Sequence, residues 1–163
     1  CTANELGRGA LYHYIGSKEQ LLIAIHDRVM DEVMLSVERT QQAGGTASEQ
    51  LTRLGDELID IIASYPDHVW VSLHEFSGLS GEHEQHYRRR RQEYERRVEA
   101  ILQAGIDGGE FREIDARLTS LAWLGMHNYT YRWLKSSDAR PAHEVASAFA
   151  DIFVRGITGN GAK

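Results

Sequence analysis

The sequence predicts an all-α fold, and three observations support this prediction. Apolar residues recur at steps of three and four along most of the 163 residues. No stretch shows the alternation of apolar and polar residues that is typical of a half-buried strand. The chain holds only two prolines, and glycines stand near the points where the helical pattern stops. We therefore expect a helical protein of one large or two small domains with a real core.

The first element lies in the stretch GRGALYHYIGSKEQLL, residues 7–22. Ser17 begins a capping box of the S-x-x-Q type, which predicts a long helix that starts at Lys18. Gly16 can adopt the left-handed conformation that ends a helix, so residues 8–14 are expected to form a separate short helix. The free N–H groups and the lysine at the start of the long helix are suited to binding a phosphate.

The helical pattern continues to the end of the chain, with glycine or proline near most of the boundaries. The expected helices cover residues 18–42 before Gly44-Gly45, residues 51–65 before Pro66, residues 68–76 before Gly78, residues 82–106 before the stretch DGGE, residues 116–135, and residues 141–157, where Pro141 is suited to a first turn. We find no internal repeat and no low-complexity segment.

Composition excludes several classes of protein. The single cysteine, Cys1, rules out an internal disulfide, and no apolar run reaches the roughly 18 residues of a membrane helix. We therefore expect a cytoplasmic protein that needs neither a membrane nor a cofactor. The net charge of −6 argues against wholesale coating of nucleic acid, so any DNA contact must come from local placement of residues. Because the chain begins at Cys1 rather than methionine, we expect an incomplete N-terminus, with a partner for the short helix upstream.

The stretch GRGALYHYIGSKEQLL resembles the second half of the helix-turn-helix of TetR-type transcriptional regulators. Their usual run is a glycine, a small polar turn, a short helix with L-Y-x-[HY]-[FI], and then x-S-K-x-x-L. Family members have about two more residues between the glycine of ELG and RGALY, so the turn is short here. The resemblance implies a truncated N-terminal helix-turn-helix DNA-binding domain over residues 1–26. A helical effector-binding and dimerisation domain would follow over residues 27–163.

A recognition helix needs side chains that reach base edges and phosphates from its exposed face. Tyr12 and Lys18 are expected to contact the DNA backbone, whereas Arg8, Ala10 and His13 lie nearer the bases. The alternative is a surface aromatic cluster in any helical bundle. The residues assigned to binding double-stranded operator DNA are Arg8, Gly9, Ala10, Tyr12, His13 and Lys18.

The stretch NYTYRWLKSSDARPAHEVASAFADIFVRGI resembles the C-terminal domain of TetR-type regulators of fatty-acid and sterol breakdown in actinobacteria. Their effectors are often acyl-CoA thioesters, so we expect an apolar pocket with arginines at its edge. Helical geometry places Arg90 and Arg91 beside the inward stripe of residues 82–106, and it points Arg88 and Arg89 away. The alternative is a solvated face whose arginines pair with nearby glutamates. The expected ligand-binding residues are Trp70, His74, Phe76, Arg90, Arg91, Tyr94, Trp123 and His127.

The aromatic helix over residues 116–135 is apolar on two opposite sides. Leu118, Leu121 and Tyr129 share one face with Gly125, and Trp123 lies on the other with His127 and Leu134. One side is expected to meet a second subunit and the other the domain's own pocket, and the sequence leaves open which is which. The final helix would complete the homodimer with Val145, Phe149, Ile152 and Phe153.

The eight histidines raise the alternative of a metal site. His83 and His86 have helical spacing, but HEQH lacks the spacing of a zinc protease, so surface histidines are the preferred interpretation and no metal is expected. No nucleophile motif or phosphate-binding glycine loop is present, so an enzyme is not expected. The sequence predicts a homodimeric, ligand-responsive repressor that an effector releases from its operator. A helical small-molecule-binding or scaffolding dimer without DNA binding is the alternative, and a metal hydrolase is the third.

Overall fold

Helices account for nearly all of the structure, a computed structural model that describes residues 8–135 and 140–158, with side chains from residue 18 onward. The elements in chain order are α1 (Arg8–Ala43), α2 (Ala47–Ser64), α3 (Pro66–His74), the 3₁₀ segment η1 (Glu75–Gly78), α4 (Gly81–Asp107), α5 (Ala116–Asn128), the 3₁₀ segment η2 (Tyr129–Arg132) and α6 (Ala142–Ile157). Within the described ranges, extended pairing is limited to an isolated bridge between Phe111 and Thr158. The all-α prediction is confirmed.

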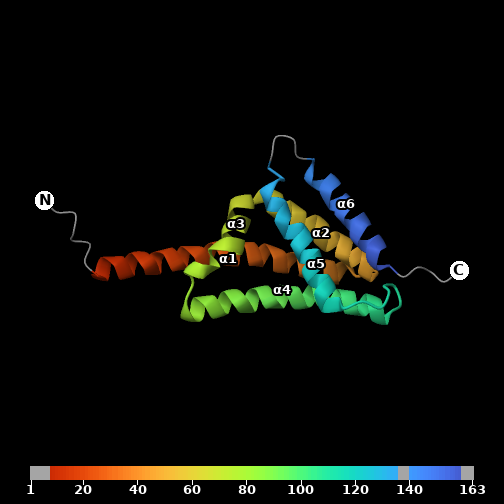
Figure 1. Ribbon diagram of the computed structural model, residues 1–163, viewed down its shortest axis with the longest axis horizontal. Coiled ribbons are helices and arrows are strands. Elements are labelled where there is room, and N and C mark those ends of the chain that lie inside the picture. Colours follow the sequence, from red (N-terminus) through yellow and green to blue (C-terminus); the bar gives the residue numbers. More distant parts are fainter. Residues whose placement is uncertain (1–7, 136–139, 159–163) are drawn as a thin grey trace.

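The predicted break at Gly16 is wrong, because α1 runs without interruption from Arg8 to Ala43. A glycine inside a helix costs only about 1 kcal/mol relative to alanine, and a break there would also give up backbone hydrogen bonds. A separate short helix would need neighbours to pack against. The first turns of α1 instead extend past the start of α4, with no other described helix beside them (Figure 1).

The other predicted boundaries agree with the structure to within a few residues, and local chemistry explains them. Gly44 and Gly45 have φ angles of 63° and 98°, which end α1 and turn the chain into α2. Thr46 then caps α2 in a reciprocal capping box with Glu49. The carboxylate of Glu110 accepts two more N–H groups of the first turn of α2, at 2.8 and 2.9 Å.

The aromatic helix ends earlier than predicted, because α5 stops at Asn128 and continues as the 3₁₀ segment η2. Thr130 donates its hydroxyl to the carbonyl oxygen of His127 at 2.7 Å. A threonine hydroxyl that occupies a backbone carbonyl in this way competes with regular helical hydrogen bonding.

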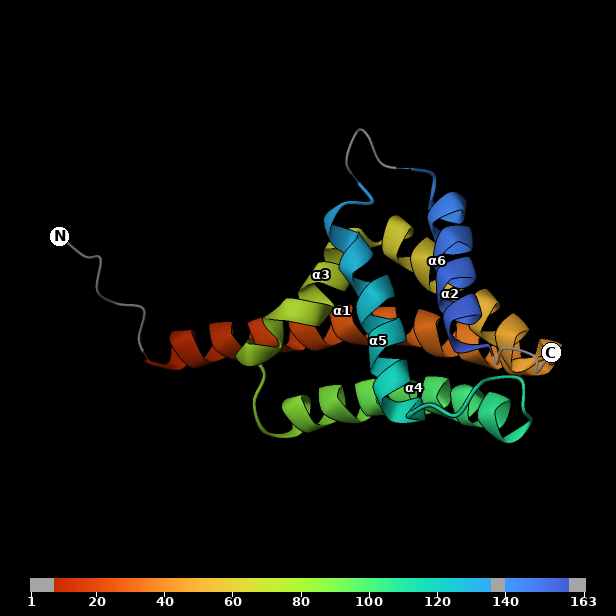
Figure 2. The ribbon, with the colours of Figure 1, turned by 45° about the vertical axis from the view of Figure 1, so that its right-hand side comes forward.

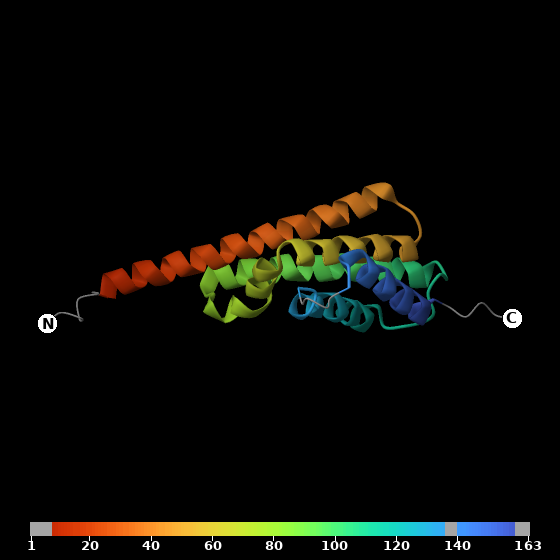
Figure 3. The same ribbon diagram turned by 90° about the horizontal axis from the view of Figure 1, so that it is seen from above.

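The helices form a bundle around α2 (Figures 1 and 2). Viewed from above, α1 lies along one side and α5 and α6 lie on the opposite side, with α2 and α4 between them (Figure 3). Helices α1 and α4 run side by side in roughly the same direction, and α6 packs mainly against α2. In the described part of the chain, no helix is long and apolar enough to cross a membrane.

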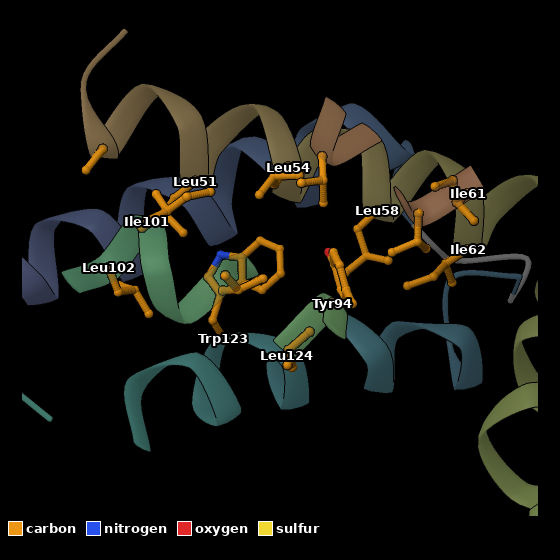
Figure 4. Close-up of a cluster of buried hydrophobic side chains, with 14 of the residues drawn as sticks. Leu51, Leu54, Leu58, Ile61, Ile62, Tyr94, Ile101, Leu102, Trp123 and Leu124 are labelled. Carbon is orange, nitrogen blue, oxygen red and sulfur yellow. The ribbon is translucent and has the colours of Figure 1, made fainter. Parts of the chain in front are cut away.

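The core lies between α1, α2, α4 and α5, and Figure 4 shows part of it. Leu54 and Ile62 of α2, Leu102 of α4 and Trp123 of α5 are all less than 3% exposed. Burial of one such side chain contributes about 1.5–3 kcal/mol. Gly55 lets α5 approach α2 closely, because a Cβ atom there would lie 2.8 Å from Nε2 of His127.

Candidate functional site

A partly enclosed cavity of about 50 Å³ lies where five helices meet. A single water needs about 10–15 Å³, so the cavity has room for a small apolar group. Its apolar wall comes from α1, α2, α3 and α5: Val29, Met30, Val33, Leu58, Ile61, Ile62, Val69, Leu73 and Leu124.

Five polar residues complete the cavity wall: Ser72, Arg91, Tyr94, Glu95 and Asn128. Arg91 and Glu95 are half-buried, whereas Ser72 and Tyr94 are 6% exposed. This is the usual composition of a small-molecule site, in which apolar walls provide affinity and a few polar groups fix orientation.

A more open hollow of about 270 Å³ adjoins the cavity and shares Arg91 and Glu95 with it. Phe76, Glu84, Tyr87, Arg88 and Gln92 line the rest of this hollow. The arrangement provides an apolar chamber beside a surface with two guanidinium groups and two carboxylates, of which Glu84 is paired with Arg88. It can take a molecule with an apolar end and an anionic end.

The run of four arginines is oriented as helical geometry predicted. Arg88 and Arg89 are exposed and Arg90 and Arg91 are half-buried. Arg90, however, does not reach the cavity, because its Nη2 donates to Oδ1 of Asp31 on α1 at 2.7 Å. The expected pairing of Arg90 with Arg91 at the pocket is therefore absent. Arg91 shares the outer hollow with Arg88 instead.

The remaining residues assigned to ligand binding are divided among separate places. Tyr94 lines the cavity, whereas Trp123 and His127 are buried at 2% and 1% exposure in the adjoining core. Trp70 and His74 stack on each other at the surface, with ring centroids 5.2 Å apart, and line a different hollow. The sequence showed these aromatic residues, but it could not show how each helix is rotated.

Several wall residues were missed by sequence reasoning. Ser72 and Asn128 carried no signal, since a polar residue in a helix is ordinarily on its solvated face. Val29 and Val33 are apolar residues four positions apart in the helix predicted over residues 18–42, and they line the cavity. Their helical spacing could have indicated that this helix contributes to the site.

A chain of hydrogen bonds connects the cavity wall to α1. Arg91 donates to the hydroxyl of Tyr87 at 2.8 Å, and this hydroxyl donates to the backbone carbonyl of Ser72 at 3.0 Å. The hydroxyl of Ser72 lies 2.8 Å from Nδ1 of His26 on α1. Burial lowers the pKa of His26 to about 4, so its ring is neutral at pH 7. Tyr87 and Ser72 therefore connect Arg91 of the cavity wall to His26 of α1.

The two histidines of HEQH bind carboxylates on α1. His83 Nδ1 lies 3.2 Å from Glu19, and His86 Nε2 lies 2.7 Å from Asp27. The hydrogen bond from Ser80, followed by that from His83, lowers the pKa of Glu19. Among the described residues, no group of three or more His, Cys, Asp or Glu is placed to hold a metal ion. These two contacts connect the start of α4 to α1.

The residues assigned to DNA binding are at the start of α1. Lys18 is exposed, whereas the side chains of Arg8, Gly9, Ala10, Tyr12 and His13 lie outside the described residues. The helix that carries these positions is the same one that supplies Val29, Met30 and Val33 to the cavity. The two predicted sites therefore share one continuous helix.

Comparison with known proteins gives a family match and several similar folds. The family described as "Tetracyclin repressor-like, C-terminal domain" matches residues 44–157. No curated protein matches the chain.

Similar solved structures extend beyond the matched region. PfmR of Thermus thermophilus, a TetR family transcriptional regulator, is 29% identical with a TM-score of 0.79, covering 92% of this chain and 82% of that one. AibR, solved in complex with isovaleryl coenzyme A and operator DNA, is 26% identical with a TM-score of 0.75, covering 87% and 77%. KstR2 of Mycobacterium tuberculosis, a ketosteroid transcriptional regulator, is similar in fold, with 21% identity, a TM-score of 0.82, and coverage of 93% and 79%.

Proposed function

Because the chain belongs to the tetracycline repressor-like family of transcriptional regulators, we propose that it is a homodimeric repressor that leaves its operator when a small molecule binds its cavity. The observation that carries this proposal is the apolar cavity, whose wall includes α1, the helix that also bears the residues assigned to DNA binding. The proposal gives the protein a binding role rather than a catalytic one. Residues 1–26 would serve DNA and residues 27–163 the effector and the dimer.

For the effector we propose a short, branched acyl-CoA thioester. The cavity has room for a small apolar group, and the adjoining hollow offers Arg88 and Arg91 to phosphate groups. A chemically similar ligand, isovaleryl coenzyme A, is bound by AibR, which is 26% identical to this chain. Arg88 and Arg91 replace the pair Arg90 and Arg91 in this role, because they line the hollow and Arg90 does not. Arg88 is paired with Glu84, and a phosphate group would have to displace this carboxylate from the guanidinium group.

Effector binding would act on DNA through α1. An acyl group in the cavity pushes on Val29, Met30 and Val33, and a phosphate on Arg91 competes with its hydrogen bond to Tyr87. Either change shifts α1 relative to α4. Two operator half-sites are read about 34–36 Å apart, so a small tilt in each subunit weakens binding.

The test uses the full-length protein and a DNA fragment from upstream of its own gene in a mobility-shift assay. We expect a shifted band that isovaleryl-CoA removes. Lys18→Ala should weaken DNA binding at every sequence and lower the slope of log affinity against log salt by about one, because it removes one phosphate contact.

Two double variants test the arginines. Arg88→Ala with Arg91→Ala should raise the isovaleryl-CoA concentration needed for release several-fold, without weakening DNA binding. Arg89→Ala with Arg97→Ala removes the same charge elsewhere on α4 and should have little effect. Failure of the protein to shift any fragment would refute the repressor, and retained acyl-CoA binding in that case would indicate a ligand-binding helical dimer without a DNA role.

A further inference from the structure

Tyr94 has an unpartnered hydroxyl group on the wall of the cavity. The residue is 6% exposed, and among the described residues no hydrogen-bond partner lies within reach of its oxygen. Figure 4 shows the side chain extending from α4 toward Leu58 of α2, with the oxygen at its tip among apolar side chains. Buried tyrosine hydroxyls normally find a partner, because leaving one unpaired is unfavourable. This one lacks a partner in the described part of the chain.

A second tyrosine on the same helix shows the ordinary arrangement. The hydroxyl of Tyr87 donates to the carbonyl of Ser72 and accepts from Arg91, so both of its hydrogen-bonding functions are satisfied. Tyr87 does not line the cavity, whereas Tyr94 does. The unpaired hydroxyl therefore belongs to a residue of the cavity wall, whereas the paired one does not.

The protonation state of Tyr94 defines what it can recognise. Burial, followed by the negative charge of Glu57, raises the pKa of the Tyr94 hydroxyl. The hydroxyl therefore stays protonated and can donate a hydrogen bond. A carboxylate would be a poor partner, since the side chains beside the Tyr94 oxygen, Leu58 among them, are apolar and would not compensate a buried charge (Figure 4). A neutral carbonyl, ether or hydroxyl oxygen suits the site.

We propose that Tyr94 determines effector specificity by donating a hydrogen bond to a neutral oxygen on the apolar part of the effector. This proposal rests on the proposed function, in that the cavity is taken to be the effector site. It adds a chemical requirement, namely that a hydrocarbon group without an oxygen leaves Tyr94 unsatisfied and binds less well. The thioester carbonyl of an acyl-CoA meets the requirement, and so does a keto group on a ring.

The test uses two small neutral probes, cyclopentanone and cyclopentane, which differ by one carbonyl oxygen. Their dissociation constants are measured by NMR titration of the wild-type protein and of Tyr94→Phe. We expect the substitution to weaken cyclopentanone about five- to tenfold, as one hydrogen bond would, and to change cyclopentane less than about twofold. For each probe the ratio of the two dissociation constants, variant over wild type, cancels the solubility of that probe in water.

Thermal unfolding supplies a second readout. Tyr94→Phe should leave the melting temperature unchanged or raise it, because it removes an unpaired polar group from apolar surroundings. Tyr87→Phe, the matched variant, should lower the melting temperature, since it breaks two hydrogen bonds.

Three results would overturn the role of Tyr94: equal weakening of both probes by Tyr94→Phe, binding of neither probe to the wild type, or a fall in melting temperature as large as that of Tyr87→Phe. These outcomes are independent of DNA release by isovaleryl-CoA. The proposal that the protein is a repressor can be refuted while the preference for cyclopentanone is observed. The preference can also be absent while release from DNA is observed.

Discussion

The two faces of α5 are both apolar, yet they have opposite environments. On the inward face, Trp123 is 2% exposed and His127 is 1% exposed, both packed into the core of the bundle. On the outward face, Leu118, Leu121 and Tyr129 are 65%, 46% and 56% exposed. The inward face contributes to folding of the single chain, and the outward face lacks a covering element within the described residues.

This difference indicates that the outward face of α5 is the one available to a second subunit. A cluster of large exposed apolar side chains is the usual mark of an association site. Ile152 of α6 is also exposed, at 66%, whereas Val145 is buried against α2. We therefore propose that the homodimer forms through the outward face of α5 together with Ile152.

The largest effect is expected from Trp123→Ala on the inward face. Removing a fully buried tryptophan leaves a cavity in the core and should lower the free energy of unfolding by about 3–5 kcal/mol, measured by urea denaturation. Trp70→Ala is the matched control, because Trp70 is 42% exposed, and it should cost less than about 1 kcal/mol. Equal losses in the two variants would contradict the assignment of Trp123 to the core.

A smaller effect is expected from acid, again through the inward face. Burial lowers the pKa of His127 from its ordinary 6.5 to about 4, although its Nδ1 bonds to the carbonyl of Trp123. Between about pH 6.5 and pH 4 the imidazole of His127 binds a proton in the unfolded chain but not in the folded protein. Its contribution to the free energy of unfolding is therefore fully present above about pH 6.5 and is lost as the pH falls toward about 4. His26, with a pKa of about 4, adds to the same loss.

The free energy of unfolding, measured by urea titration across this pH window, checks the sign. His127→Gln should show a shallower decline with acid than the wild type, because one of the two buried histidines has been removed. Identical pH dependence in the two proteins would show that His127 titrates normally in the folded state.

The smallest effect on folding is expected on the outward face. Leu118→Glu with Leu121→Glu should change the unfolding free energy of the monomer by about 0.5 kcal/mol or less, because both side chains are already exposed. The same variant should convert the dimer to a monomer in light scattering, since it places two charges in the interface. Leu35→Glu on α1, where Leu35 is 46% exposed, should leave the dimer intact. A monomeric wild type would refute this interface.

Much of the site followed from the sequence where local rules apply. The helical period of residues 82–106 placed Arg91 beside the interior, and Tyr94 of the same helix was expected to bind the ligand; both line the cavity. The same rule placed Arg90 beside the interior, but it could not show that Asp31 of another helix would hold it. Trp70 of α3 was assigned to the pocket for its aromatic character, yet it is 42% exposed and lines a different hollow. Phe76 is 46% exposed and lines the outer hollow. Short helices such as α3 have too few turns for a periodic pattern to define their orientation.

The sequence by itself determined the helices and most of their ends, because capping residues, glycines and apolar periods act over a few neighbouring residues. Gly44-Gly45, Pro66 and Pro141 each marked a boundary that the structure shows. Only the tertiary structure decided that α1 continues through Gly16, that α5 turns Trp123 inward, and that the hydroxyl of Tyr94 has no partner among the residues described. Each of these depends on what lies beside a residue in space, and contacts between distant segments are fixed by packing of the whole bundle rather than by local propensity.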